Sequence, residues 1–371
     1  MTAFIPTARP SIGEEELESV RDVFESRWLG LGSTTAEFEK RLSEFCSGRS
    51  VVATNTGTSA IQLALETIGI GPGDEVITPA MTFVATAQAI LATGATPVLC
   101  DIDRESLNVT ANLLDRARTS RTRAVVPVDY RGMPVDIDEI GTWASQFDIR
   151  VVVDSAHSFG SLYADGTRVG SAGDICCFSF DPIKNITAGE GGAIVFADEA
   201  EASIASQMRV LGIDSTAWSR MESRRPWEYD VTRRGYRFHM PNFNAAIGLR
   251  QLDKLEAFGR RKQAVLTAYL QASLDPDILT VWPFPVDRAI PFLALVATSR
   301  RDALMDHLRR REIGTGVNYQ PMSRFTLLRD STRTTIPNTE EVADRLVAVP
   351  LLNDQSDAEI DRVVEGLITF R

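Results

Sequence analysis

The strongest constraint on the fold is a series of short apolar runs between residues 50 and 197, which alternate with helical patterns. Continuous Val/Ile-rich runs of this length are typical of strands that are buried on both faces of a sheet. Helices between such strands form crossover connections, so the sequence predicts an α/β fold with a mostly parallel, doubly wound sheet. The expected strands are 50–54, 74–79, 96–103, 123–130, 149–156, 174–180 and 192–197.

The pattern changes after Asn244, where residues 244–274 predict one long helix. A chain of 371 residues is long enough for two domains. We therefore expect a large domain over 1–250 and a smaller α+β domain over 251–371. The smaller domain is expected to contain a strand at 290–297 and helices at 300–312 and 357–370.

Net charge and composition exclude several classes of function. The formal net charge is −11 and the pI is about 5.0, which argues against a nucleic acid or an anionic membrane as partner. The sequence has no apolar signal segment and no run of about 18 apolar residues, so we expect a cytoplasmic protein without a membrane span. Three histidines, and four cysteines without CxxC spacing, predict no metal site and buried thiols in a reducing compartment.

Lys184 is the unusual residue of the predicted sheet. The chain has 35 arginines but four lysines, and Lys184 alone stands between two strand-like runs, in "CCFSFDPIKNITAGEGGAIVF". Asp154 ends the run "IRVVVD", at the carboxyl end of a strand, where α/β proteins bind ligands. A buried lysine readily becomes a nucleophile for carbonyls, and an aspartate can hold a pyridine nitrogen protonated, so the pair suits pyridoxal 5′-phosphate (PLP). A structural ion pair for Lys184 and a helix cap for Asp154 are the alternatives.

Other residues at the same sheet edge supply groups that this cofactor requires. In "TNTGTSAIQLAL", we expect Gly57 to adopt an unusual backbone angle and Thr58 and Ser59 to open a helix that binds phosphate. Ser179 offers another hydroxyl, and Phe83 offers an aromatic ring. Each has a structural alternative, because Thr-Ser starts many helices and a single phenylalanine usually belongs to a core. His157 follows Asp154 by one helical turn and would lie near the same site, although a lone histidine is more often a packed core residue.

The order of these motifs resembles the sugar aminotransferase family of PLP enzymes known as the DegT–StrS family. The similarity extends from "RPSIGEEELESV" to "AVPLLNDQSDAEIDRVV", which is essentially the whole chain. It implies fold type I and a cofactor that passes between PLP and its amino form, pyridoxamine phosphate (PMP). The motifs that carry it are "NTGTSAIQLAL", "GPGDEVITPAMTFVATAQAI", "GATPVLCDID", "VVVDSAHSFG", "FSFDPIKNITAGEGGAIV" and "NFNAAIGLRQL".

The resemblance also implies a role for each residue. Lys184 forms the Schiff base and moves the proton, Asp154 pairs with the pyridine nitrogen, and His157 lies beside the ring hydroxyl. Phe83 stacks on the ring. The phosphate is bound by Gly57, Thr58, Ser59 and Ser179.

Two stretches depart from the family pattern. "GYRFHM" carries Arg237 and His239 where the family has Asn and Arg, and that Asn reaches the phosphate of the neighbouring subunit. Arginine binds phosphate in a bidentate manner, so we expect Arg237 to contact the cofactor. "NYQPMS" keeps Tyr319 but has Asn318 in place of a histidine. By the resemblance, Asn318, Tyr319 and His239 lie near the substrate.

The resemblance therefore predicts an enzyme that moves an amino group from an amino acid, expected to be glutamate, to a keto group of a nucleotide-linked deoxysugar. "GYRFHMPNFNAAIG" is more similar to members that act at sugar C4 than at C3. Aminotransferases for scyllo-inosose or aminohydroxybenzoate remain alternatives, as does a non-catalytic relative that only binds a ligand. A PMP-dependent sugar dehydratase would have histidine in place of Lys184.

The resemblance also predicts a homodimer with shared active sites. Residues 213–234 read as a long surface loop, which we expect to cover the partner's site and to meet the diphosphate of the substrate. A solvated charged loop is the alternative. The arginines in question are Arg220, Arg224, Arg225, Arg233 and Arg234.

Overall fold

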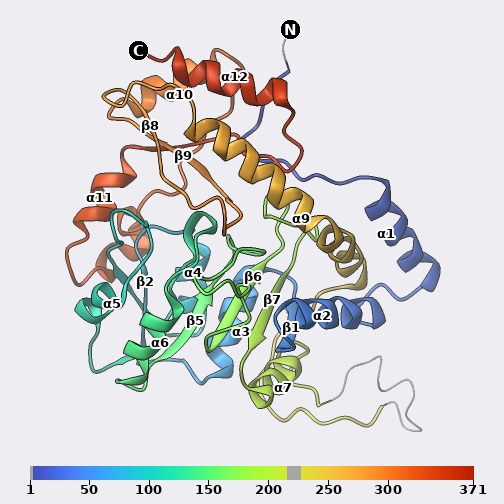
Figure 1. Cartoon of the computed structure of the whole chain (residues 1–371). Helices are drawn as coiled ribbons and strands as arrows, with labels where there is room; N and C mark the ends of the chain where they lie inside the picture. The colour runs from blue at the N-terminus through green and yellow to red at the C-terminus, as the bar shows by residue number, and fades with distance from the viewer. Residues whose placement is uncertain (1–2, 215–226) are drawn as a thin grey trace.

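The computed structural model describes residues 3–214 and 227–371, and its centre is a seven-stranded sheet (Figure 1). The strand order is β1-β7-β6-β5-β4-β2-β3. Neighbouring strands from β3 to β6 are parallel, and β7 is antiparallel to both β6 and β1. The strands are β1 (Ser50–Thr54), β2 (Glu75–Pro79), β3 (Thr96–Cys100), β4 (Thr122–Val125), β5 (Arg150–Asp154), β6 (Ile175–Ser179) and β7 (Gly192–Phe196).

Both faces of this sheet are buried, which explains the continuous apolar runs. Val151 and Val153 face one core, whereas Val152 faces the other. The first core is covered by α2 (Ser33–Phe45), α5 (Ala111–Ala117), α6 (Ile137–Ser145) and the first half of α9 (Asn242–Leu270). The second core is covered by α3 (Gly57–Thr67), α4 (Ala85–Ala92) and α7 (Glu199–Met208). The predicted α/β fold with a mostly parallel sheet between helices is therefore confirmed.

The C-terminal part forms a second, smaller layer around a three-stranded antiparallel sheet of order β10-β9-β8. In Figure 1 this part lies at the top, next to both termini. Ile5 belongs to its core and pairs with Ile313. The elements are β8 (Thr280–Val281), β9 (Ala294–Ala297), α10 (Arg301–Arg309), α11 (Pro337–Ala343), β10 (Leu346–Val349) and α12 (Asp357–Ile368).

Helix α9 joins the two parts. Leu252 and Leu255 pack in the core of the large sheet, whereas Val265 and Leu266 pack in the core of the small sheet. The predicted division at residue 250 stays a prediction, and α9 runs across it without a break. Helix α1 (Glu14–Ser26) packs against α9, and short 3₁₀ turns occupy Tyr130–Gly132, Met322–Arg324 and Thr326–Ser331.

The boundaries of the predicted elements differ from the observed ones for simple reasons. The strand expected at 290–297 begins at Ala294, because Pro291 has no N–H to donate and Phe292 N donates to Arg131 O at 2.9 Å, outside the small sheet. β10 was not among the expected strands, since its four residues are too short to show a period. Residues 215–226 of the expected surface loop lie outside the described residues, but Asp214 N donates to Asp230 O at 3.1 Å.

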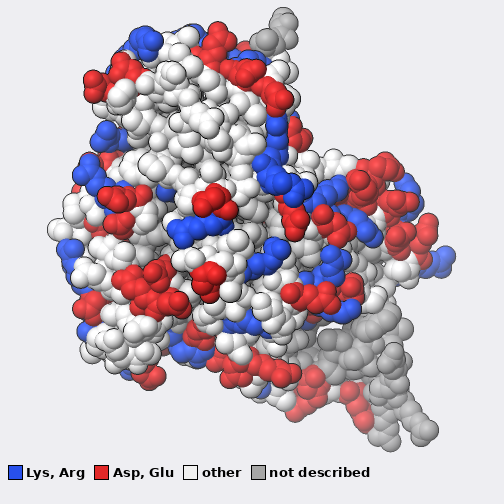
Figure 2. Space-filling view, in the orientation of Figure 1, with Lys and Arg blue, Asp and Glu red and all other residues white. Residues whose placement is uncertain are grey.

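The described surface carries mixed charge. Figure 2 shows acidic and basic side chains interspersed over the face that is in view. Of the helices that the structure describes, none combines the length and the apolar character that crossing a membrane requires.

Candidate active site

Asp154 lies at the carboxyl end of β5 with its side chain fixed by two donors. Thr86 Oγ1 donates to its Oδ2 at 2.7 Å, and Ala156 N donates to its Oδ1 at 3.2 Å. The carboxylate is buried, and burial raises the pKa of Asp154 while the two donors and Lys184 oppose that shift. The two donors and Lys184 offset only part of the cost of burying this negative charge. A cationic group placed against the carboxylate would therefore be bound favourably.

Lys184 lies in the connection between β6 and β7, on the wall of the same cavity. Its Nζ lies 4.6 Å from the centre of the Phe292 ring. Burial lowers the pKa of Lys184, although Asp154 and Asp181 favour the charged form. The amine is therefore shifted towards its neutral, nucleophilic state. The turn through Gly189–Gly192 returns the chain beside β6, where Ser179 is paired with Gly192.

The first turn of α3 and the end of β6 form a cup that is lined by Gly57, Thr58 and Ser179. The unusual backbone angle expected at Gly57 is not observed, because Gly57 is not among the glycines with positive φ. Space is what excludes a side chain: a Cβ on Gly57 would lie 2.7 Å from Ser179 Cβ. Gly192 has a similar role, since a Cβ there would lie 2.4 Å from the carbonyl oxygen of Thr56.

Ser59 does not line this cavity. Its hydroxyl donates to Asn55 Oδ1 at 2.7 Å and accepts from Thr56 N at 3.1 Å. Thr56 Oγ1 in turn accepts from Ser59 N, which completes a capping box at the start of α3. Ser59 therefore stabilises the helix that presents the cup, and its hydroxyl is already occupied.

His157 and Tyr319 also line the cavity and lie next to each other. The His157 ring stacks on Phe292, with centroids 4.1 Å apart, and its Nε2 lies 3.3 Å from Tyr319 Oη. Burial, Lys184 and Lys262 lower the pKa of His157 well below its usual value, so the ring is neutral at pH 7. Neutral imidazole offers one donor and one acceptor, which suits a hydroxyl as partner.

Three further predicted residues lie at the mouth or outside the cavity. Phe83 is 53% exposed at the mouth, with its ring 5.5 Å from that of Tyr319. Asn318 lines the cavity, and its carbonyl oxygen accepts a hydrogen bond from Tyr130 Oη. Arg237 does not line the cavity and is exposed.

His239 also lies outside the cavity, on a segment that runs beside the end of β1. It pairs with Thr54, and the neighbouring Phe238 O accepts from Asn55 N at 2.7 Å. Burial, Arg237 and Arg209 lower the pKa of His239. Of the loop arginines, Arg233 and Arg234 are exposed, and Arg220, Arg224 and Arg225 lie outside the described residues.

Several site residues were absent from the sequence prediction. Thr86 could have been found, because it follows Phe83 by one helical turn and so faces the same edge. Phe292 and Lys262 come from the C-terminal third of the chain, and no local pattern connects them to Lys184. The other cavity-lining residues are Thr56, Ile61, Thr82, Ala85, Ala156, Asp181, Ile183 and Glu190.

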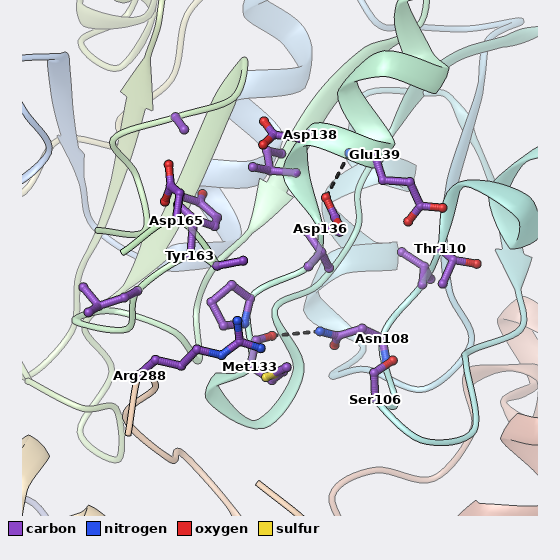
Figure 3. Close-up of a pocket in the computed structure, with 17 residues that line it drawn as sticks. Ser106, Asn108, Thr110, Met133, Asp136, Asp138, Glu139, Tyr163, Asp165 and Arg288 are labelled. Atoms are coloured by element: carbon purple, nitrogen blue, oxygen red, sulfur yellow. Dashed lines mark hydrogen bonds between the residues drawn. The ribbon is translucent and has the colours of Figure 1, made fainter. Parts of the chain in front are cut away.

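A second cavity, of about 270 Å³, lies around the start of α6 (Figure 3). It contains none of the predicted site residues. Its polar groups maintain local structure: Asp136 Oδ1 caps Glu139 N at 2.9 Å, and Asn108 Nδ2 donates to Met133 O at 2.8 Å. Within the described ranges, no group of three or more His, Cys, Asp and Glu side chains is arranged to hold a metal ion.

The main cavity, of about 250 Å³, fits a pyridine aldehyde that carries a phosphate. It contains the carboxylate of Asp154, whose burial is only partly offset, and the amine of Lys184, whose pKa is lowered. It also contains the N-terminus of α3, where Gly57 lies close against Ser179. Helix N-termini bind phosphate through free N–H groups. The carboxylate therefore suits the ring nitrogen of the cofactor, the amine suits its aldehyde, and the helix N-terminus suits its phosphate.

Comparison with known proteins agrees with this geometry. The model of the DegT/DnrJ/EryC1/StrS aminotransferase family matches residues 10–368. The aminotransferase TlmJ from Streptoalloteichus hindustanus is 33% identical, with 98% of both chains covered and a TM-score of 0.90. The sugar aminotransferase CalS13 from Micromonospora echinospora is 29% identical, with 99% of this chain and 100% of that chain covered and a TM-score of 0.90. Spr1654 from Streptococcus pneumoniae, in its PMP form, is 29% identical, with 98% of both chains covered and a TM-score of 0.90.

Proposed function

Since the chain belongs to the DegT/DnrJ/EryC1/StrS aminotransferase family and is a PLP-dependent aminotransferase, we propose that it aminates a keto group of a nucleotide-linked deoxysugar. The proposed donor is an amino acid, namely glutamate, and the proposed position is C4. The observation that carries the proposal is the shared cavity of Asp154 and Lys184, with Asp154 oriented by Thr86.

PLP, when bound, supplies an electron-withdrawing ring that stabilises negative charge on the carbon next to the transferred nitrogen. We assign the residues around that ring as follows. Asp154 holds the ring nitrogen in its protonated form, and Thr86 prevents the carboxylate from turning away. Phe83 covers one face of the ring, and His157 donates to the ring hydroxyl.

Lys184 performs two tasks in this proposal. Its amine would anchor the cofactor covalently in the resting enzyme, and after its release Lys184 Nζ would move the proton between the substrate carbon and the cofactor carbon C4′. A neutral amine is needed for both tasks. The lowered pKa of Lys184, which is caused by burial, supports this assignment. Gly57, Thr58 and Ser179 bind the phosphate, whereas Ser59 acts only through the helix cap.

The proposed acceptor is supported by similarity and by the cavity mouth. CalS13, a sugar aminotransferase, aligns over 99% of this chain. Asn318 and Tyr319 line the cavity and carry an amide and a phenol that can bind the hydroxyls of a sugar. The mouth also carries Asp181 and Glu190, so the cations for a diphosphate must come from elsewhere.

We propose that these cations come from a second copy of the chain. Arg237 and His239 lie outside the cavity of their own subunit. The mouth also exposes apolar surface, since Phe83 is 53% and Ile183 is 43% exposed. A partner that covers the mouth would bury these side chains and bring Arg237 to the cofactor phosphate of the neighbouring subunit, in a homodimer with shared sites.

A panel of acceptors tests the proposed reaction. The purified enzyme with PLP is incubated with glutamate and either nucleotide-linked 4-keto-deoxysugars, 3-keto-deoxysugars or scyllo-inosose, and product masses are measured. We expect amination of a 4-keto nucleotide sugar, and no product with Lys184→Ala. Amination of scyllo-inosose alone would contradict the proposed acceptor, while still agreeing with an aminotransferase.

Mixed dimers test the shared site. Chains with Lys184→Ala and chains with Arg237→Ala are each expected to be inactive. After subunit exchange, one site of each mixed dimer contains both residues, so part of the activity should return. No recovery, despite exchange shown by mass spectrometry of differently tagged chains, would place Arg237 outside the partner's site.

A further inference from the structure

Asp129 is a buried carboxylate that the proposed mechanism does not use. It follows β4 in the chain, and its side chain is fully buried. In the part of the chain that the structure describes, no lysine or arginine lies within ion-pair distance of it. Burying an unpaired negative charge is costly, so the position of Asp129 requires an explanation.

Neutral donors bind both ends of the Asp129 side chain. Ser155 Oγ and Ser158 Oγ donate to its Oδ2 at 2.7 Å and 2.6 Å, and Val135 N donates to its Oδ1 at 2.9 Å. An ionised carboxylate accepts at both ends, whereas an asparagine would turn its NH₂ group towards one set of these donors. Burial, together with the charge of Asp154, raises the pKa of Asp129 to about 6, and the three donors oppose that shift. The group is therefore largely ionised at pH 7.

The two serines belong to the short segment 154–158, which directly follows β5 and contributes to the cavity. The residues of this segment that line the cavity are Asp154, Ala156 and His157. Ser155 and Ser158 are fully buried outside the cavity lining, and their hydroxyls bond to Asp129 instead. Asp129 thus binds the segment through the side chains that do not face the cavity.

The bonds to Asp129 are the short contacts of this segment. Within the segment, Ser158 N donates to Ser155 O at 3.2 Å, and from outside it Asn185 Nδ2 donates to His157 O at 3.4 Å. The bond of 2.6 Å from Ser158 to Asp129 is shorter than both, and hydrogen bonds to a charged acceptor are about twice as strong as neutral ones.

The sheet fixes Asp129 in turn. Its N–H donates to Asp154 O at 3.1 Å, and the preceding Val128 pairs with Asp154 in a parallel bridge. Asp154 ends β5 and is also held by Thr86, so it has supports of its own. His157 lies three residues beyond the strand, next to Ser158, and so depends more on the bonds to Asp129.

We propose that Asp129 is a positioning residue for His157, which it serves by binding Ser155 and Ser158 from the side away from the cavity. This inference rests on the proposed role of His157 at the ring hydroxyl of the cofactor. Asp129 itself does not line the cavity and takes no direct part in the reaction.

The histidines of the chain make a direct test possible, because there are only three: His157, His239 and His307. NMR of the full-length protein, with PLP bound and with ¹⁵N-labelled histidine, records their ring signals, and His157→Gln identifies the signal of His157. The His157 ring stacks on Phe292 at 4.1 Å, so a small movement should shift its signal. We expect Asp129→Asn and Ser158→Ala each to shift this signal and to leave those of His239 and His307 in place.

The rate of the first half of the reaction supplies the second readout. Glutamate alone is added to the PLP-loaded protein, and the change in cofactor absorption is followed at several glutamate concentrations. For Asp129→Asn, the rate at saturation should fall by about tenfold, as expected when a hydrogen bond to the cofactor is lost. The half-saturating concentration should stay within about twofold, because Asp129 does not line the cavity.

Asp101→Asn is the matched control. Asp101 is a buried carboxylate that follows β3 and also accepts from three donors, namely Asn338 N at 3.1 Å and Thr339 N and Oγ1 at 2.8 Å each. It does not line the cavity. Its loss should lower stability without moving the His157 signal or the rate.

Three outcomes would overturn the proposal: an unmoved His157 signal, an equal shift in Asp101→Asn, or a shifted signal with an unchanged rate. If Asp129→Asn does not fold, Ser158→Ala, which keeps the carboxylate and removes one bond, is measured in its place. The NMR signal requires no substrate and the half-reaction requires no sugar. A failure of the proposed acceptor would therefore be distinguishable from a failure of this proposal.

Discussion

The floor and the rim of the cavity are built differently. The floor, which we define as Gly57, Asp154, Ser179 and Lys184, belongs to the carboxyl edge of the large sheet and to the first residue of α3. The rim, defined as Phe83, Ile183, Asn318 and Tyr319, comes from the segment before α4, from the connection between β6 and β7 and from the C-terminal part of the chain. Phe83 and Ile183 are exposed, whereas Asp154 and Ser179 are buried.

This difference separates the residues expected to carry out the reaction from those expected to select the substrate. Asp154 and Ser179 are held by the ladder hydrogen bonds of β5 and β6, and Gly57 is held by the start of α3, so these residues cannot move without disturbing their elements. Such a base suits groups that must meet one cofactor in one geometry. Rim residues can change with less consequence for the core. We therefore expect floor substitutions to act on the rate for every substrate and rim substitutions to act on which substrate is used.

The largest expected effect is that of Lys184→Ala. Loss of the amine should reduce turnover by more than about 10⁴-fold, as for other residues that take part directly in bond changes. The visible absorption of the bound cofactor should change, because its covalent link to the chain is lost. Lys40→Ala, which removes an exposed lysine from α2, is the control. Transamination at a normal rate by Lys184→Ala would disprove the assignment of the floor.

Asp154→Asn should have the next largest effect. The variant keeps the shape of the side chain but removes the charge that holds the ring nitrogen protonated, so we expect a loss of about 10²–10³-fold in kcat. PLP should still bind, because the phosphate cup is intact, and equilibrium dialysis can show this. If the variant turned over normally, Asp154 would have only a structural role, as a cap for the segment after β5.

The floor was predictable from sequence to a large extent, and the reasons are physical. Asp154 and Ser179 end apolar runs, and carboxyl ends of parallel strands meet at one edge. Their meeting with Lys184 therefore follows from topology. The assignment of Ser59 was less secure, because a hydroxyl at a helix start serves equally well as a cap or as a phosphate ligand. The structure shows the capping bonds.

The remaining contacts depend on tertiary packing that no local pattern encodes. Phe292 lies before β9 and Lys262 lies in the middle of α9, more than seventy residues from Lys184 in each case. Phe292 and Lys262 come close to Lys184 because α9 packs against both cores. The role of Gly57 was likewise invisible, since it arises from the distance to Ser179 rather than from a backbone angle.

Thr86→Val tests how the floor is oriented, and its expected effect is smaller. The variant loses the 2.7 Å bond to Asp154 Oδ2, so the pKa of Asp154, already raised by burial, should rise further. Activity requires the ionised carboxylate and is lost as pH falls through that pKa. The acid limb of the kcat profile should thus move to higher pH by about one unit, with about tenfold lower kcat at pH values on that limb.

Thr93→Val provides the matched control for this prediction. Thr93 is buried at the other end of α4 and donates to Ile90 O at 2.8 Å, so its loss removes a similar bond away from Asp154. It should lower stability without moving the pH profile. Equal shifts in both variants would mean that Thr86 acts through the stability of α4.

The smallest expected effects distinguish Ser179, which lines the cup, from Ser59, which caps α3. Ser179→Ala removes a hydroxyl from the cavity wall, and losing a hydrogen bond to a charged phosphate should weaken PLP binding by about 10-fold or more. Ser59→Ala removes part of the capping box and should lower the free energy of unfolding by about 1 kcal/mol. Its effect on PLP affinity should be slight, because its hydroxyl is bonded to Asn55 and Thr56. Denaturant unfolding without PLP and PLP titration of both variants measure the two quantities separately. If Ser59→Ala weakened PLP binding as much as Ser179→Ala, Ser59 would have to turn from its cap towards the phosphate, and the cup would extend one residue further into α3.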